Sequence, residues 1–343
     1  MRPDYSPVAD HSLPIDIMPT QPALASTSSF PTPRTVTFVT AALALLLFAS
    51  SLWAEGKAPL GDVILGEDTV WSGTVVIDGV VVVGRNATLT IQPGTTILFK
   101  RRDTNRDGIG DSEIRVLGKI AASGLPDHPI VFKSGEAHPA PKDWSYVLIF
   151  TSGKKNVIDY CQFHDAFSGL QVHFSTASVS NCLFSDNNEG IRFGRAKLTL
   201  NHSLITRNNI GVRFTRMEGP VEIKNNDISS NQVGVFLVPS GQNIVDFFEP
   251  GRTGKPWNEG HLDITANNIH ANNDYNLKLG AKQLWDLKIS DNWWGTTSEP
   301  TAQQRIFDKE RDQELGRAII TPMACAPIPN AGIRQITGTA HGQ

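Results

Sequence analysis

The chain has 343 residues, of which 40% are hydrophobic, and a formal net charge of −3 at pH 7. This charge gives no global attraction to nucleic acid, which is therefore excluded as an expected partner. Three cysteines exclude a disulfide-rich scaffold, and the apolar content suffices for one long core in a single domain.

The first 34 residues are rich in proline, serine and threonine. Such a segment buries too little apolar surface to fold, so residues 1–34 are predicted to be a disordered leader. Residues 35–54 follow as a charge-free apolar run. This length fits either a signal peptide, cleaved before Glu55, or a membrane anchor. Both outcomes predict an exported protein (periplasmic, cell-surface or secreted), with membrane contact only through residues 35–54 if they are kept.

An acidic loop with the spacing of a calcium site occurs at residues 103–111. Its oxygen donors at loop positions 1, 3, 5, 7 and 9 come from Asp103, Asn105, Asp107, the Ile109 carbonyl and Asp111. A glycine at position 6 allows the sharp bend that such loops need. The segment resembles the calcium loops of dockerins and thrombospondin type 3 repeats. It departs from the EF-hand pattern at position 12, which is Ile114, because Glu113 lies one residue earlier. We expect structural calcium, with a plain polar turn as the alternative.

A short pattern recurs six times between Tyr160 and Gly295. Each copy has one apolar anchor, and the anchors fall 21, 21, 23, 41 and 25 residues apart. They are Phe163, Phe184, Ile205, Ile228, Ile269 and Trp294. A repeat of about 20 to 30 residues built from short strand-like pieces predicts a solenoid, and the apolar spacing of a helical repeat is missing.

Polar and small residues repeat in register with the anchors. Asparagine follows the anchor by three residues at Asn187, Asn208, Asn231 and Asn272. A glycine column comes next, at Gly169, Gly190, Gly211 and Gly234, with Asn276 in the last place. The column before the anchors reads Cys161, Cys182, Ser203, Asn226, Asn268 and Asn292, with a slip of one residue at Asn268. Because glycine and asparagine enter positive φ at low cost, we interpret these columns as backbone corners repeated in every coil.

These repeats resemble those of right-handed parallel β-helix proteins, the architecture of pectate lyases and many bacterial surface proteins. Residues 86–99 and 113–134 resemble the first coils of secreted bacterial members. Residues 291–297 and 306–322 resemble their closing segment. The resemblance does not select an activity, since the fold hosts lyases, hydrolases, adhesins and metal-maturation factors alike.

The predicted fold class is all-β, a single-stranded right-handed parallel β-helix over residues 55–322. A loop excursion interrupts the coils at residues 242–260, and residues 323–343 are expected to be a flexible tail. Phe247 and Trp257 in the excursion either form a sugar-stacking platform or cover the edge of a coil.

Arginines fall in register on the predicted coils: Arg192 with Arg213, and Arg195 with Arg216. Like charges stacked at the coil spacing repel each other unless an anion screens them. The arginines are therefore candidate ligand-binding residues for the carboxylates of an acidic polysaccharide. The alternative is a solvated face paired with aspartate or glutamate from a neighbouring column.

Asp165 and Asp186 share another column, in which Arg207 follows. Two carboxylates one coil apart lie near the separation of a retaining glycosidase pair. Together with Arg192 and Arg213 they are the weak catalytic candidates, and a ladder that neutralises its own charge is the alternative.

Cys161 and Cys182 stack in consecutive coils. A buried thiol stack is favoured over a disulfide, because parallel side chains in register give a poor dihedral angle.

The sequence favours an exported, calcium-stabilised β-helix that binds carbohydrate or has a structural role, without catalysis. A polysaccharide lyase or glycoside hydrolase acting on an acidic polysaccharide is the alternative. A role in copper-enzyme maturation has little support, because nine histidines and four methionines are scattered along the chain.

Overall fold

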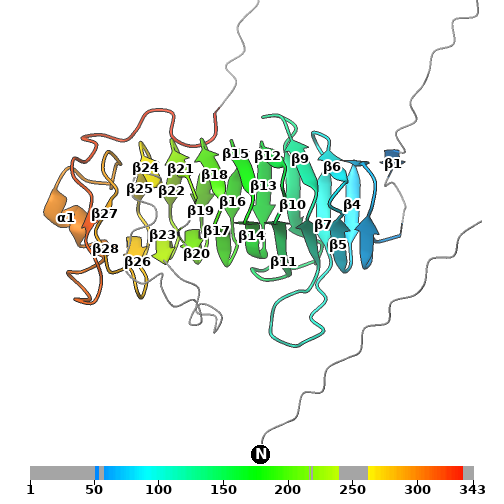
Figure 1. The fold of residues 1–343 in the computed structure, drawn as a ribbon, viewed down its shortest axis with the longest axis horizontal. Coiled ribbons are helices and arrows are strands. Elements are labelled where there is room, and N and C mark those ends of the chain that lie inside the picture. The colour runs from blue at the N-terminus through cyan, green and yellow to red at the C-terminus, as the bar shows by residue number, and fades with distance from the viewer. Residues whose placement is uncertain (1–50, 54–57, 216, 218, 239–261, 335–343) are drawn as a thin grey trace, which may run out of the picture. The chain divides into compact units, whose positions relative to one another are not determined.

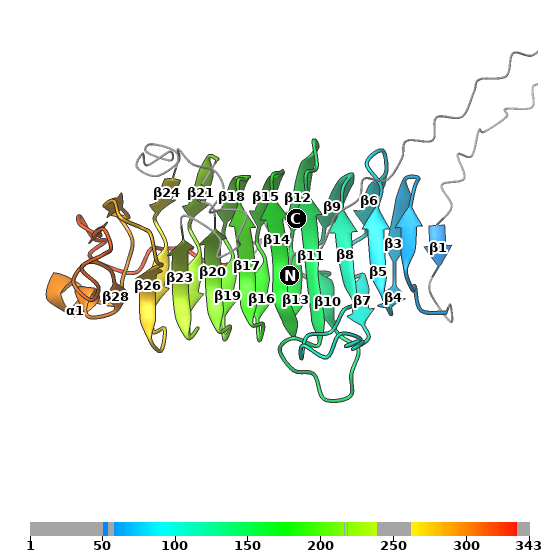
Figure 2. The same ribbon diagram turned by 60° about the horizontal axis from the view of Figure 1, so that its bottom comes forward.

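The computed structural model describes residues 51–53, 58–215, 217, 219–238 and 262–334. Its strands pair in parallel into three long sheets, here called A, B and C, and between residues 63 and 279 every third strand along the chain returns to the same sheet. Each turn of the chain therefore contributes one strand to each sheet, as Figures 1 and 2 show. This arrangement is the predicted β-helix.

The strands of sheet A are β1 (Ser51–Trp53), β3 (Thr69–Ser72), β6 (Thr88–Ile91), β9 (Lys119–Ser123), β12 (Lys155–Asp159), β15 (Thr176–Ser180), β18 (Lys197–Asn201), β21 (Val221–Lys224) and β24 (Leu262–Thr265). The strands of sheet B are β4 (Thr74–Ile77), β7 (Thr96–Phe99), β10 (Ile130–Ser134), β13 (Cys161–His164), β16 (Leu183–Ser185), β19 (Leu204–Thr206), β22 (Asp227–Ser229) and β25 (Asn268–His270).

The strands of sheet C are β2 (Val63–Leu65), β5 (Val80–Val83), β8 (Glu113–Val116), β11 (Trp144–Phe150), β14 (Ala166–His173), β17 (Glu189–Gly194), β20 (Ile210–Thr215), β23 (Val233–Val238), β26 (Tyr275–Leu279) and β28 (Ile306–Phe307). A short helix, α1 (Glu299–Gln303), and the parallel pair β27 (Leu287–Lys288) and β29 (Ala318–Ile319) follow the last full coil. No helix among the described residues has the length and apolar character needed to cross a membrane.

The anchors of the repeat stack inside the coils, as predicted. Phe163 lies in register with Phe184, and their rings stack at 4.9 Å between centroids. Phe132 extends the stack by one coil, 4.6 Å from Phe163. Ile205 and Ile228 continue the same buried column. In-register parallel pairing repeats each inward side chain at the strand spacing, so the core forms as columns rather than as one cluster.

Asparagines form a continuous ladder at the corner between sheets B and C. The side-chain amide of Asn187 donates to Asn208 Oδ1 at 3.0 Å, and Asn208 donates in turn to Asn231 at 2.9 Å. Asn231 donates to Asn272 at 3.0 Å, and Asn272 to Asn276 at 2.9 Å. All five are buried, so the ladder satisfies polar groups that water does not reach.

A second ladder lies at the corner between sheets A and B, and it corrects the predicted register. Asn226 donates to Asn267 at 2.9 Å, and Asn267 donates to Asn292 at 3.0 Å. Asn267 stands two residues before its anchor Ile269, so the column has no slip. Asn268 lies beside this ladder, in register with Asp227 of β22.

Positive φ, the predicted reason for glycine in the glycine column, is wrong. None of its four glycines has positive φ; the left-handed conformation occurs instead at non-glycine residues that open the same corner. These residues are Asp165, Asp186, Arg207, Ser230 and Ala271. A Cβ on Gly190 would lie 2.6 Å from the carbonyl oxygen of Gly211 in the next coil. Glycine is therefore needed for close approach between coils rather than for backbone conformation.

Residues 323–334 lie against the coils, which corrects the predicted flexible tail over this part of it. The amide of Ile328 donates to Asn268 Oδ1 at 2.7 Å, and the amide of Gly332 donates to the Asn225 carbonyl at 2.9 Å. Further bonds join His202 to Asn330 and Asn181 to Arg334. In Figure 1 this red segment, here called the strap, runs back along the corner between sheets A and B.

The two stacked cysteines are free and buried. Burial raises the pKa of the Cys161 thiol. The thiol of Cys182 contacts the Ser180 carbonyl at 3.0 Å. The structure thus has the buried thiol stack that was favoured, while Cys325 is free and exposed in the strap. The leader, the apolar segment up to residue 50 and the excursion 242–260 lie outside the described residues.

Candidate functional site

The outward face of sheet C carries the predicted arginine pair. Arg192 in β17 lies in register with Arg213 in β20. On the neighbouring strands of sheet C, one residue before this pair and three residues after it are aligned with the arginines. These strands lie side by side in Figure 2. Neighbouring side chains are about 4.8 Å apart. We call this line of side chains the C-face row: Gln171, Arg192, Arg213, Phe236, Lys278 and Phe307.

A carboxylate that the sequence pattern does not predict lies between the two arginines. Glu189 Oε1 is 2.5 Å from Arg213 Nη1, and its Oε2 is 3.8 Å from Arg192 Nη1. The Glu189 side chain is 1% exposed, whereas the arginines are 28% and 27% exposed. Burial lowers the pKa of Arg192, and the charge of Glu189 opposes that shift. Repulsion between the stacked arginines is thus relieved inside the protein.

Beyond Arg213 the C-face row alternates cations with aromatic rings. The guanidinium carbon of Arg213 lies 5.5 Å from the ring centre of Phe236. The Lys278 amine lies 5.6 Å from the same ring and 5.1 Å from that of Phe307. These are cation–π distances, and they present flat apolar surface and positive charge together along the coil axis.

The second predicted arginine pair does not join this row. Arg195 follows β17 at the corner, with φ of 49°, and its guanidinium lies 5.6 Å from the ring centre of Phe174. Arg216, Phe247 and Trp257 lie outside the described residues.

A second buried carboxylate lies toward the early end of the same face. Glu113 in β8 is paired with Arg115, and its side chain is 3% exposed. Burial raises the pKa of Glu113, and burial beside Glu113 raises the pKa of Tyr146 to about 12. Glu113 therefore belongs to the sheet face rather than to the acidic loop.

Sheet pairing separates the two glutamates. Tyr146 pairs with Ser168, and Ser168 with Glu189, while Glu113 lies one strand before Tyr146. Three strand spacings amount to about 14 Å, beyond the range of about 5 to 10 Å in glycosidase pairs. A sequence signal existed for both residues. Each is a glutamate two or three positions before an outward arginine. The other members of its column carry no charge, and they are Val80, Tyr146, Ser168, Ile210, Val233 and Tyr275.

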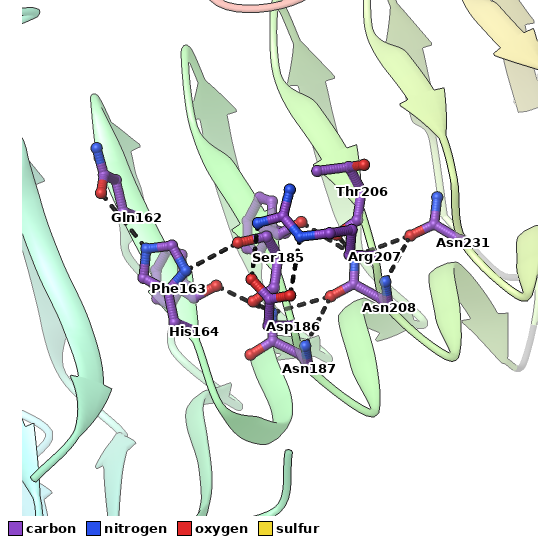
Figure 3. A network of polar contacts seen from close by, with 11 residues as sticks. Gln162, Phe163, His164, Ser185, Asp186, Asn187, Thr206, Arg207, Asn208 and Asn231 are labelled. Carbon is purple, nitrogen blue, oxygen red and sulfur yellow. Dashed lines mark hydrogen bonds and ion pairs between the residues drawn. The ribbon is translucent and has the colours of Figure 1, made fainter. Parts of the chain in front are cut away.

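The aspartate column divides into separate interactions, shown in part in Figure 3. Arg207 donates from Nε and Nη2 to the two oxygens of Asp186, at 2.9 and 2.8 Å. This bidentate pairing lowers the pKa of Asp186 and raises that of Arg207. His164 Nδ1 lies 2.8 Å from Ser185 Oγ on the neighbouring strands. The charge of Asp186 is thus neutralised within the column, as the alternative interpretation has it.

Asp165 has other partners. Its Oδ2 accepts a hydrogen bond from the Ser134 amide at 3.3 Å. Burial raises the pKa of Asp165, and the nearby charge of Asp143 adds to the shift. Because Asp165 and Asp186 bind different groups, the structure does not arrange them as an acid and base facing one substrate.

The acidic loop connects β7 to β8 and bends onto its own side chains. Asp103 accepts hydrogen bonds from the amides of Asp107 and Gly108 at 3.2 and 3.1 Å. Thr104 donates its hydroxyl and its amide to Asp111 Oδ2, at 2.5 and 2.7 Å, and these two bonds lower the pKa of that carboxyl. Gly108 has φ of 83°, which the bend requires. The donors suit calcium in kind and spacing, although no three acidic, histidine or cysteine side chains converge within the described residues.

Two family models match this chain. A pectate-lyase-like β-helix domain matches residues 62–168, and a right-handed β-helix region matches residues 147–293. Comparison with curated proteins and with solved structures gave no match. The two matched segments overlap and run through the stacked coils from β2 to the end of the asparagine ladders. The chain therefore belongs to the right-handed parallel β-helix proteins of the pectate-lyase-like type.

Proposed function

We propose that this protein is an exported β-helix module that binds a polysaccharide along the outward face of sheet C, without catalysis. The observation that carries the proposal is the C-face row, in which cations and aromatic rings follow one another at the coil spacing. The apolar C–H face of a sugar ring packs on aromatic side chains, and guanidinium and ammonium groups donate hydrogen bonds to the sugar oxygens. A repeating polymer suits a repeating surface.

Export is proposed from the sequence alone. Arg34 is followed by the apolar run of residues 35–54, which has the length of a signal peptide or anchor. A calcium ion held by the loop of residues 103–111 is proposed to stabilise the early coils.

The absence of catalysis is proposed from the separation of the titratable groups. Glu113 and Glu189 lie three strands apart, and Asp186 is neutralised by Arg207. General acid–base chemistry needs two groups that reach one bond of the substrate. Neither Glu113 with Glu189 nor Asp165 with Asp186 meets that condition.

An enzyme acting on acidic polysaccharide is the second candidate. One feature favours it: Glu113 is buried beside Arg115 and Tyr146, and burial raises its pKa. A carboxyl group of this kind is suited to act as a general acid. Lyase activity would release unsaturated uronates that absorb in the ultraviolet, and hydrolysis would release reducing ends.

The test is calorimetric binding to a panel of neutral and acidic polysaccharides, with assays for product release run in parallel. We expect binding without turnover, and a loss of at least about tenfold in affinity for Phe236→Ala or Lys278→Ala. Lys224→Ala on sheet A, where the lysine pairs with Asp263 at 2.7 Å, is the matched control and should bind normally. Turnover would favour the enzyme, and unchanged binding by both face variants would exclude the C-face row as the site.

A further inference from the structure

The corner at which sheet C leads into sheet A carries an exposed aromatic pair. Phe150 ends β11 and Phe174 directly follows β14, and each of these residues is 38% exposed. Their rings meet edge to face, with 5.6 Å between the ring centres. Burial in the core does not explain this pair, because both rings keep much of their surface in water.

The same position of this corner recurs in three consecutive coils. Thr151, Phe174 and Arg195 follow the neighbouring strands β11, β14 and β17 (Figure 2), and their φ values are 48°, 52° and 49°. The amide of Thr151 donates to the His173 carbonyl at 3.1 Å, and the amide of Phe174 donates to the Gly194 carbonyl at 3.3 Å. The coils therefore hold these side chains in a line along the corner.

Lysines follow the sheet A side of the same corner. Lys155 lies in register with Thr176, and Thr176 lies in register with Lys197. Lys119 takes the equivalent place one coil earlier, because β9 pairs with β12 in the residues that follow. We call the aromatic pair and the cations around it the basic ridge: Lys119, Phe150, Lys154, Lys155, Phe174, Arg195 and Lys197.

The positive charge of the basic ridge is not offset by acidic side chains at the corner. No aspartate or glutamate occurs where the chain crosses this corner, at residues 117–119, 150–155, 173–176 and 194–197. Among the described residues, none of the four lysines of the ridge takes part in an ion pair. In the C-face row, by contrast, Glu189 pairs with both arginines. An anionic partner would relieve the repulsion between the stacked lysines.

The shape and composition of the ridge fit a flat anionic partner. Ligand sites for single chains and small molecules are concave, whereas the side chains of a corner point apart. Aromatic and aliphatic side chains enter the headgroup boundary of a bilayer, while basic side chains beside them attract anionic lipids. Clusters of about four to eight basic residues are typical of binding to anionic lipids, and the basic ridge has five.

We infer that the basic ridge binds the surface of a bilayer that contains anionic lipids, with Phe150 and Phe174 in the headgroup region. The inference does not depend on the proposed polysaccharide binding. It adds a membrane contact to the one that the sequence predicts through residues 35–54. Because the ridge follows the coil axis, this contact lays the coils along the membrane.

Lysine footprinting on the full chain tests the contact one side chain at a time. The chain is mixed with vesicles of phosphatidylcholine, or of phosphatidylcholine and phosphatidylglycerol, and then acetylated for mass spectrometry. Lys154, Lys155 and Lys197 should react at least about threefold more slowly with the anionic vesicles, and high salt should remove this protection. Lys133, exposed on sheet B, is the internal control and should react equally with both. Insertion of residues 35–54 alone would not produce this difference.

Variants separate the contribution of the rings from that of the charges. Phe174→Asn removes one ring and keeps a residue that enters positive φ at low cost, and should lower the protection of Lys197 at least about threefold. Lys154→Gln combined with Lys155→Gln should lower it by at least as much. Lys133→Gln is the matched control and should leave it unchanged. Each replaced side chain is exposed, so the fold should be kept, which circular dichroism checks.

Three results would overturn the inference. One is equal acetylation of the ridge lysines with anionic and neutral vesicles. The second is slowing of Lys133 to the same degree as the ridge lysines. The third is protection of the ridge by polygalacturonate but not by vesicles, which would make the ridge a carbohydrate surface. None of these results bears on binding along the C-face row, because calorimetry of its own variants measures that binding separately.

Discussion

The early coils, residues 63–150, and the later coils, residues 155–293, build the same three sheets with different corners. Between sheets B and C, two of the early coils insert loops at residues 100–112 and 135–143, whereas the later coils turn within four residues. Both early loops leave the same edge of the coils (Figure 2). The sheets therefore fix the cross-section, and the corners are free to differ.

The early coils depend on packing and on individual polar contacts. Phe99 stacks on Trp144 with ring centres 4.0 Å apart. The Ser112 hydroxyl donates to the Lys100 carbonyl at 2.6 Å and accepts from the Gly79 amide at 3.2 Å. None of these contacts repeats from coil to coil, so this half has no polar periodicity.

The later coils depend on repetition. Each buried asparagine of the ladders bonds to the coils on both sides, so one residue type serves several neighbouring coils. The family matches divide near the same place, with one model over residues 62–168 and the other over residues 147–293. The same β-helix is thus stabilised at its corners in two ways, by individual contacts in the early coils and by repeated asparagine ladders in the later coils.

The largest expected effect breaks a ladder of the later coils. Asn208 donates to Asn231 at 2.9 Å and to the Phe184 and Thr206 carbonyls at 3.0 Å each. Its own oxygen accepts from the amide of Asn187. Asn208→Ala leaves several buried groups unpaired and should lower the free energy of unfolding by about 3 kcal/mol or more. Urea unfolding followed by circular dichroism measures the loss.

Two further variants sharpen this comparison. Asn209→Ala removes an exposed asparagine next to the ladder, with one contact of 3.5 Å to Asn188, and should cost less than about 0.5 kcal/mol. Ser112→Ala removes the two hydrogen bonds of an early corner and should cost about 1 to 2 kcal/mol. Equal losses for Asn208→Ala and Asn209→Ala would show that the ladder is not what stabilises the later coils.

The next effect concerns the early coils alone. Calcium at about 100 times its Kd should stabilise the chain by about 2.7 kcal/mol, because the ion binds the folded loop. Asp103→Asn should remove most of this gain, since position 1 supplies a ligand charge. Asp274→Asn makes the same charge change at an exposed site of the later coils and should leave the gain unchanged.

Hydrogen exchange locates the calcium effect. Added calcium should slow amide exchange in residues 86–134 more than in residues 160–238. Equal slowing in both segments, or no shift in the melting temperature on adding calcium, would contradict a calcium site in the loop.

The ladder half of the fold could be predicted because its identical side chains recur at fixed positions. The anchor column from Phe163 to Ile269 was predicted from spacing alone, and the structure confirms it. The reason for the glycine column could not be seen in the sequence. Glycine serves both positive φ and close approach. The φ values of the four glycines and the 2.6 Å approach at Gly190 distinguish these roles.

The candidate site was only half predictable, for a similar reason. In-register spacing placed Arg192 beside Arg213, because register is periodic. It did not show that Glu189 lies between them, since side-chain reach is not periodic. The strap was also missed. Its bonds to Asn268 and Asn225 involve residues far apart in the chain, without any repeat.

The smallest expected effect concerns the strap, which crosses only later coils. His202 Nδ1 lies 3.2 Å from the Asn330 carbonyl. Burial lowers the pKa of His202, and the nearby charge of Arg334 adds to the shift. The folded state therefore favours neutral His202, while the unfolded chain takes up a proton near pH 6.5. Stability must fall as pH drops through that value, because the unfolded state binds more protons.

His202→Gln isolates this contribution, because it removes the titrating group and keeps a polar side chain at the corner. Burial also lowers the pKa of His164, but that contribution is present in both proteins and cancels in the comparison. The melting temperature of the parent chain should fall more between pH 7.5 and pH 5 than that of His202→Gln. A chain ending at Met323 lacks Asn330 and Arg334 and should show the same reduced dependence. Identical pH profiles for all three proteins would mean that the strap does not perturb His202, and that the later coils are closed by their ladders alone.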